Sequence, residues 1–186
     1  MRKSLPFLVL LAAASLPASS QEVVHALTGT VSSIDSASKT ITVFQDNGNQ
    51  GIFTEAGGGK ARYAFDKKLA QQTTQAAEFN SQGAYAIVFY YGIIEHPTVV
   101  AVKSLGKGPF DSTEGTIDSF NSRDHSITVT DKSGAAKTFK LAADSIAEGD
   151  TGAIEALKLP ARKGDHVRIV SQVVDGAPTA LFIRDI

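Results

Sequence analysis

The stretch GTIDSFNSRDHSITVTDKSGAAKTFK, residues 115–140, occurs in a second version earlier in the chain. Shifted back by 86 positions, it aligns without a gap with GTVSSIDSASKTITVFQDNGNQGIFT, residues 29–54. The alignment predicts that the chain contains a duplicated β unit. The identical pairs are Gly29/Gly115, Thr30/Thr116, Ser33/Ser119, Ser36/Ser122, Ile41/Ile127, Thr42/Thr128, Val43/Val129, Gly48/Gly134 and Phe53/Phe139.

Both copies have the pattern of a three-stranded β-meander. In the first copy, residues 28–34 are rich in β-branched side chains, and residues 39–44 alternate between apolar residues and threonine. Such alternation is typical of a half-buried strand. The turn at residues 46–49 contains an Asn-Gly dipeptide, which favours the positive φ of a hairpin, and a third strand is predicted from Ile52.

After the meander, each copy is predicted to continue with a connection and two more strands. In the first copy, residues 66–79 have helix-forming composition, and Asp66 is a suitable N-cap. In the second copy, the connection covers residues 142–160, with a helical turn at 153–157. These parts align at an offset of 81, so the first connection is five residues longer. The remaining strands are predicted at 84–92, 98–105, 165–173 and 178–186.

This order of elements is the layout of a small OB-like barrel. We therefore predict an all-β fold of two tandem five-stranded small OB-like barrels with short helical inserts. Units of roughly 80 residues can each bury a core of their own. The predicted segments are a signal peptide at 1–20, a first barrel at 21–105, a linker at 106–112 and a second barrel at 113–186.

The amino terminus has the three-part pattern of a secretory signal peptide. Arg2 and Lys3 precede a short apolar run, and small residues follow it. Cleavage is predicted near Ser20, with Ala18 as the alternative, which places the mature protein in the periplasm or outside the cell. The run is too short to span a bilayer comfortably, and no second long apolar run follows. We therefore expect no membrane span in the mature chain.

Composition excludes several classes of function. The chain has no cysteine, which removes disulfides, thiolate metal sites and cysteine nucleophiles. Loss of Arg2 and Lys3 with the signal peptide leaves 16 of the 18 basic residues against 19 acidic ones, a net charge of −3. Nucleic-acid affinity usually depends on clustered Lys and Arg, and no such cluster is present, so no nucleic-acid partner is expected.

The motifs of the two copies resemble a family of exported bacterial small β-barrel domains of unknown function that often occur in tandem. The matching pattern is Gly-Thr-apolar, then Ile-Thr-Val, then Gly164-Asp165-x-Val167-x-Ile169, then Asp175-Gly176-x-Pro178-Thr179-Ala180-x-x-Ile183. The first copy departs from this pattern after Thr54 and has Gly83-Ala84 in place of Gly-Asp. The resemblance implies a fold and an exported setting, and it supplies no catalytic residue.

Motifs for metal binding or catalysis are weak. None of the four histidines, at positions 25, 96, 125 and 166, has the spacing of metal ligands. Asp144, Glu148 and Asp150 lie in a predicted glycine-containing loop. This loop lacks the Asp-x-Asp-x-Asp-Gly spacing of calcium-binding loops. The chain has no Gly-x-Ser-x-Gly elbow. We predict that the protein is not an enzyme and has no metal or cofactor.

One strand distinguishes the two copies. Large apolar side chains follow one face of the fourth strand of the first copy, whereas His166 and Arg168 take the aligned positions in the second and indicate a solvated face. An apolar face of this kind marks either a covered surface or a binding surface. If the face is covered, the two candidates for the covering segment are residues 66–79 and the second barrel. The candidate binding residues are Tyr85, Ile87, Phe89 and Tyr91.

The leading hypothesis is an exported, non-catalytic module that binds an unidentified protein or small ligand in the cell envelope through this face or the groove between the barrels. The alternative is a structural or accessory envelope protein, and an enzyme of unrecognised type is the third possibility. Neither ligand nor oligomeric state follows from the sequence. Replacing Tyr85 and Phe89 by serine separates the first two hypotheses, because a loss of stability without a loss of binding identifies the face as core.

Overall fold

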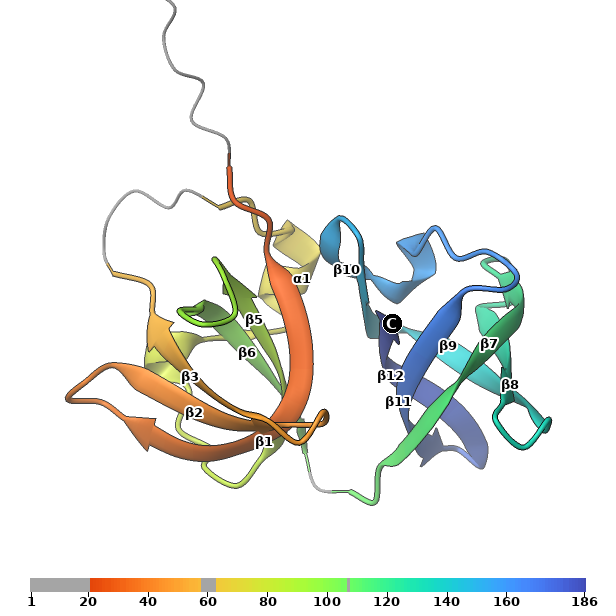
Figure 1. The fold of residues 1–186 in the computed structure, drawn as a ribbon, viewed down its shortest axis with the longest axis horizontal. Helices are drawn as coiled ribbons and strands as arrows, with labels where there is room; N and C mark the ends of the chain where they lie inside the picture. Colours follow the sequence, from red (N-terminus) through yellow and green to blue (C-terminus); the bar gives the residue numbers. More distant parts are fainter. Residues whose placement is uncertain (1–20, 58–62, 107) are drawn as a thin grey trace, which may run out of the picture.

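The computed structural model describes residues 21–57, 63–106 and 108–186, and it contains two five-stranded β-barrels side by side (Figure 1). The predicted fold class is therefore confirmed. The elements in chain order are β1 (His25–Asp35), β2 (Thr40–Gln45), β3 (Gln50–Glu55), α1 (Lys67–Gln71), β4 (Thr74–Gln75), η1 (Ala76–Glu78), β5 (Tyr85–Tyr91), β6 (Thr98–Gly106), β7 (Asp111–Asn121), β8 (Ser126–Asp131), β9 (Ala136–Gly149), β10 (Gly152–Glu155), η2 (Ala156–Lys158), β11 (His166–Val174) and β12 (Ala177–Asp185).

The two barrels have the same order of strand pairing. In the first, β1, β2 and β3 form the antiparallel meander, β5 pairs with β1 and β6, and a short parallel contact between β3 and β6 closes the barrel. In the second, β7, β8 and β9 form the meander, and parallel pairing of β9 with β12 closes the barrel. This is the order of an OB-like barrel, and closure removes exposed strand edges.

The registers of the two meanders also correspond. A bulge interrupts the β1–β2 pairing between Val31 and Ser33, and another interrupts the β7–β8 pairing at the positions 86 residues later. Gly29 and Gly115 occupy equivalent places where the backbone of the next strand passes too close for a side chain. The aligned glycines therefore meet the same steric requirement in both barrels.

Each barrel encloses its own apolar core. Both cores draw on the inward faces of their five strands, as the alternation of β-branched residues predicts. The first core contains Leu27, Val31, Ile41, Val43, Phe53, Val88, Val99 and Val102. The second contains Ile117, Ile127, Val129, Phe139, Leu141, Val167, Ile169 and Ile183.

The connection in the first barrel differs from the predicted helix over residues 66–79. Asp66 does cap a helix, because its side chain accepts hydrogen bonds from the amides of Lys68 and Leu69, but α1 ends at Gln71. Thr74 and Gln75 instead pair with β6, which gives the backbone of these residues a strand partner. No helix in the described ranges is long and apolar enough to cross a membrane.

The second connection also differs from the prediction. Strand β9 continues to Gly149 through residues that the sequence indicated as a loop, and it turns into β10. Ser145 explains the continuation, since its buried hydroxyl accepts from the amide of Ala142 at 2.8 Å and donates to the carbonyl of Ala180 at 2.6 Å. This bond secures the chain at a register shift in the β9–β12 pairing.

A third apolar cluster lies between the barrels, and we call it the junction. Its members on the first barrel come from β1 and the residue just before it, α1, β5 and β6, and those on the second come from β9, β11 and β12. At the offset of 81, Phe89 corresponds to Val170 and Ala101 to Phe182, so similar faces of the two barrels meet. The buried members are Val24, Ala26, Leu69, Ile87, Phe89, Ala101, Ile146, Val170 and Phe182.

We expect Gly115→Ala to lower the free energy of unfolding by about 1–3 kcal/mol or more, because the added methyl group overlaps the backbone oxygen of Thr130. Gly57→Ala is the matched control, since no atom of the described residues lies within 4 Å of its added methyl group. Urea unfolding of both variants measures the difference. Equal stabilities would contradict the close approach of β7 and β8.

Candidate functional site

The four candidate residues on β5 have different surroundings. Ile87 and Phe89 are 0% exposed and belong to the junction, so neither can contact a ligand in this arrangement. Tyr85, at the start of the strand, stacks on Phe110 with ring centroids 4.9 Å apart. Tyr91, at the other end, is half-buried and lines a cavity. The placement therefore leaves Tyr91 as the member of this set that can act in binding a ligand.

The Tyr85 hydroxyl is also engaged within the protein. It donates a hydrogen bond of 2.6 Å to Asp46, which also accepts from Thr28 at the same distance. Burial is the main cause that raises the pKa of the Tyr85 phenol, and the bond to Asp46 acts in the same direction. This tyrosine closes one end of the junction.

The prediction that one face of β11 is solvated is wrong for part of that strand. Arg168 is half-buried and binds Glu114 of the neighbouring β7 at 2.6 Å. Val170, the next residue on the same face, is 1% exposed and lies in the junction with Phe182. The two polar residues at the start of the strand concealed the apolar contact that follows.

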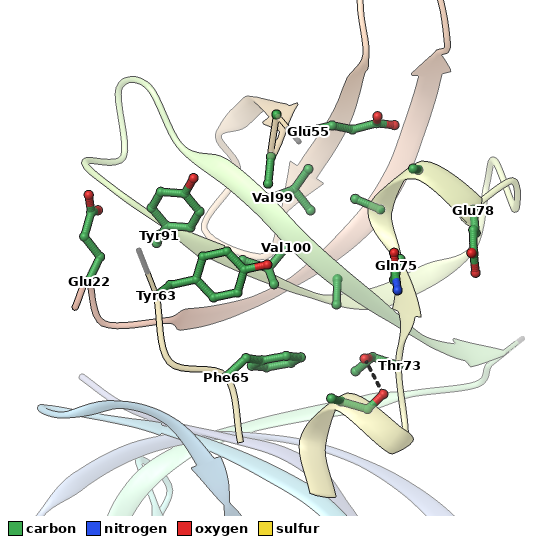
Figure 2. Close-up of a pocket in the computed structure, with 16 residues that line it drawn as sticks. Glu22, Glu55, Tyr63, Phe65, Thr73, Gln75, Glu78, Tyr91, Val99 and Val100 are labelled. Carbon is green, nitrogen blue, oxygen red and sulfur yellow. Dashed lines mark hydrogen bonds between the residues drawn. The ribbon is translucent and has the colours of Figure 1, made fainter. Parts of the chain in front are cut away.

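A cavity of about 740 Å³ lies on the first barrel beside the Tyr91 end of β5 (Figure 2). The connection between β3 and β5 forms one side of it, and β6 lies behind it. Residues 58–62 of this connection lie outside the described residues. The lining residues are Glu22, Glu55, Ala56, Gly57, Tyr63, Phe65, Ala70, Thr73, Gln75, Ala76, Ala77, Glu78, Tyr91, Val99, Val100 and Ala101.

Strand β6 provides the apolar back of the cavity. Its outer edge pairs with β3 up to Val99 and with β4 from Ala101, so the partner strand changes at Val100. The pairing with β5 also shifts register at this point, which leaves Val100 as an extra residue. Bulges bend a strand and redirect its side chains. The cavity therefore lies where the barrel changes its edge partner.

Aromatic residues form another part of the wall. Tyr63 pairs with Glu22 through an isolated bridge, and its ring stacks on Tyr91 with centroids 5.1 Å apart and planes at 26°. Phe65 packs against Phe89 with centroids 5.1 Å apart. The aromatic wall thus contacts the junction through Phe65. Figure 2 shows Tyr63, Phe65 and Tyr91 at the cavity.

The charged side chains of the described lining are three glutamates. Glu22, Glu55 and Glu78 lie at separate edges of the cavity (Figure 2). Among the described residues, no Lys, Arg or His lines it. The described lining therefore combines carboxylates at its edges with an aromatic wall and an apolar back.

Of the three acids predicted to lie in a loop, Asp150 is exposed in the turn between β9 and β10, whereas Glu148 and Asp144 make contacts across the junction. Glu148, 8% exposed, accepts from the Ala26 amide at 2.7 Å and binds the His25 ring at 2.6 Å. Asp144 binds the buried Lys103 ammonium at 3.1 Å. Their carboxylates are thereby directed to different residues of the first barrel.

The remaining histidines lie at the surface. His125 has φ of 49° in the turn before β8, and His96 and His166 are also exposed. Over residues 21–57, 63–106 and 108–186, no three His, Cys, Asp or Glu side chains come together in a way that could hold a metal ion.

Sequence reasoning missed most of the cavity. Tyr63 and Phe65 are separated by one residue and precede the capped helix, and this pair was the available signal. The three glutamates come from three different segments and carry no common pattern. Their grouping depends on barrel closure.

No protein-family model matches the sequence, and no curated protein matches it either.

Phe89→Ser is expected to lower the free energy of unfolding by about 3–5 kcal/mol, the range for removal of a buried phenylalanine side chain. Phe89 is fully buried, whereas Phe44 is 55% exposed on β2, so Phe44→Ser is the matched control. Chemical denaturation of the two variants makes the comparison. A small effect at Phe89 would argue against the junction.

Burial raises the pKa of the Glu148 carboxyl above its ordinary value of 4.5, and the hydrogen bonds from His25 and Ala26 act against this shift. The folded state therefore holds this proton more tightly than the unfolded state. The stabilisation from Glu148 is fully present below pH 4.5 and is lost as pH rises through the raised pKa. Glu114 behaves in the opposite way, because hydrogen bonds from Lys132 and Arg168 lower its pKa.

Carboxyl-carbon NMR titration checks these directions. We expect the midpoint of Glu148 above 4.5 and that of Glu114 below 4.5. A Glu148 midpoint at or below 4.5 would contradict burial as the main influence on this carboxyl, because the bonds from His25 and Ala26 act to lower its pKa.

Proposed function

We propose that the protein is an exported, non-catalytic binding module whose ligand occupies the cavity beside Tyr91. The single observation that carries this proposal is the cavity itself, with about 740 Å³ of space and a wall of stacked tyrosines. Small-molecule sites typically have volumes of about 300–1,000 Å³ and combine apolar walls with a few polar groups. The size and lining of this cavity fit that description.

The binding role is favoured over catalysis by the arrangement of polar groups in the cavity. Its carboxylates lie at separate edges, and a catalytic site instead needs a base within hydrogen-bond reach of the group that it activates. The described part of the lining also contains no histidine or lysine. A ligand can be held here without being transformed.

Export and family membership form part of the same proposal. The signal-peptide pattern at residues 1–20 supports export, and the motifs of the two copies support membership of the exported small-barrel family and origin by duplication. The corresponding registers of β1–β2 and β7–β8 agree with duplication. The partner is then a molecule of the cell envelope or its surroundings.

The alternative function, a structural or accessory role in the envelope, is favoured by the junction. Apolar burial and the contacts of Glu148 and Asp144 join the barrels firmly. Such a connection suits a rigid spacer. The binding function requires the cavity, whereas the structural role does not.

Tyr91→Ala is expected to abolish retention of the ligand from envelope extract, because it removes half of the stacked pair that lines the cavity. The mature chain is immobilised, and mass spectrometry identifies retained small molecules and proteins. Phe44→Ala is the control, since it removes an exposed aromatic side chain outside the lining. Circular dichroism confirms that both variants are folded.

Two outcomes would contradict the binding proposal. Retention that is equal in wild type and Tyr91→Ala would place any ligand elsewhere. Retention of nothing by the wild type, together with a phenotype that depends on the junction and not on Tyr91, would favour the structural role.

A further inference from the structure

We infer that the second barrel contains a separate binding site for a polyhydroxyl compound of the sugar class. The site is a pocket of about 460 Å³ at the end of the barrel where β7 begins and β11 turns into β12 (Figure 1). It shares no lining residue with the cavity beside Tyr91, so binding here goes beyond the proposed function and does not depend on it.

The pocket lies where the two barrels differ in the size of their inward side chains. The strand registers place Ser171 of β11 where the first barrel has Tyr90. They likewise place Thr113 of β7 where the first barrel has Leu27. Leu27 and Tyr90 belong to the first core, and the Tyr90 ring packs on Phe53 with centroids 5.6 Å apart. Two small hydroxyl residues thus replace two large core residues, and the exchange leaves space in the second barrel.

The hydroxyl groups of these two residues have spare hydrogen-bonding capacity. Thr113 and Ser171 are only 5% and 3% exposed, and both line the pocket. The Ser171 hydroxyl is 3.5 Å from the carbonyl of Asp111, and the Thr113 hydroxyl makes no hydrogen bond with a described residue. Every fully enclosed polar side-chain atom of the described residues has a partner, so the Thr113 hydroxyl must face the open space of the pocket. A ligand that pairs with these buried groups gains affinity, because leaving them unpaired is costly.

The other residues of the lining match the two kinds of surface that a sugar presents. A hydroxyl can both donate and accept, and Gln172 adds an amide with both functions. Phe139, Val173 and Pro178 provide apolar surface on which the C–H groups of a sugar ring can pack. Ligand sites commonly combine apolar walls with a few polar groups that fix orientation. A hydrocarbon of the same size would leave the hydroxyls without partners.

The described charges of the pocket do not select a ligand charge. The rim carries one carboxylate and one ammonium, those of Asp111 and Lys137. The Lys137 ammonium also lies 3.6 Å from the carboxylate of Asp131. The ligand class therefore follows from the hydroxyls and the apolar wall, and not from a net charge.

The test titrates the purified mature chain with glucose, galactose, mannose, N-acetylglucosamine, maltose and cellobiose. Cyclohexanol is the control probe, because it has a ring of similar shape and a single hydroxyl. The amide NMR signals of Thr113, Ser171 and Gln172 report occupation of the pocket. At least one sugar is expected to shift these signals and to bind about tenfold or more tightly than cyclohexanol, since it can pair with several polar groups at once. Tighter binding of a disaccharide than of glucose would identify a glycan chain, rather than a free sugar, as the source.

Variants assign the binding to this pocket. Ser171→Tyr introduces the residue that the first barrel has at this place, and it is expected to fill the pocket and abolish the shifts. Ser122→Tyr is the matched control, because this serine is exposed in the turn after β7 and lies outside the lining. Thr113→Val removes a hydroxyl at nearly constant shape, so it is expected to weaken binding about fivefold without lowering the free energy of unfolding. If Ser171→Tyr does not fold, Thr113→Val decides the question.

Four results would overturn the sugar site. They are the absence of shifts with every sugar, binding of cyclohexanol as tight as that of the best sugar, binding that survives in Ser171→Tyr, and binding that is unchanged in Thr113→Val. The site is also separable from the proposed function, because Tyr91→Ala is expected to leave sugar binding unchanged. Failure of the sugar site leaves the cavity beside Tyr91 as it is, and failure of Tyr91-dependent retention leaves the sugar site as it is.

Discussion

The structure depends on the apolar contact between the two barrels. Phe89 of the first barrel and Phe182 of the second are at most 1% exposed because each lies against the other unit's face. Separate barrels would expose both phenylalanines, together with Ile87 and Ile146, to water. Burial of a side chain of this size contributes about 1.5–3 kcal/mol. The contact also shields the bonds that Glu148 and Lys103 form across it, which strengthens these bonds and makes loss of a partner costly.

The cavity depends on this contact through shared residues. Phe65 packs on Phe89 of the junction and also lines the cavity, and Ala101 belongs to both. The connection between β3 and β5 has a double role as well, since Leu69 is buried in the junction and the residues after it line the cavity. Disruption of the junction is thus expected to disturb the aromatic wall, whereas loss of the wall leaves most of the junction in place.

The barrels also divide their charges in different ways. Glutamates of the second barrel are held by basic residues, and these pairs lie in or near the junction for Glu148 and Glu155. The glutamates around the cavity have no such partner among the described residues. Pairing of a charged side chain compensates for the cost of its burial and so serves the fold.

The sequence by itself determined the fold class, because the period of two in the strands, the Asn-Gly turn and the alignment of residues 29–54 with 115–140 are local or repeated patterns. It also indicated Asp66 as a helix cap. It did not determine how far α1 extends, since Thr74 and Gln75 gain strand partners on β6. It gave two readings of the β5 face, and only the tertiary structure assigned Phe89 to the junction and Tyr91 to the cavity. The reason is that burial and grouping depend on contacts between distant segments, which no local pattern of side chains records.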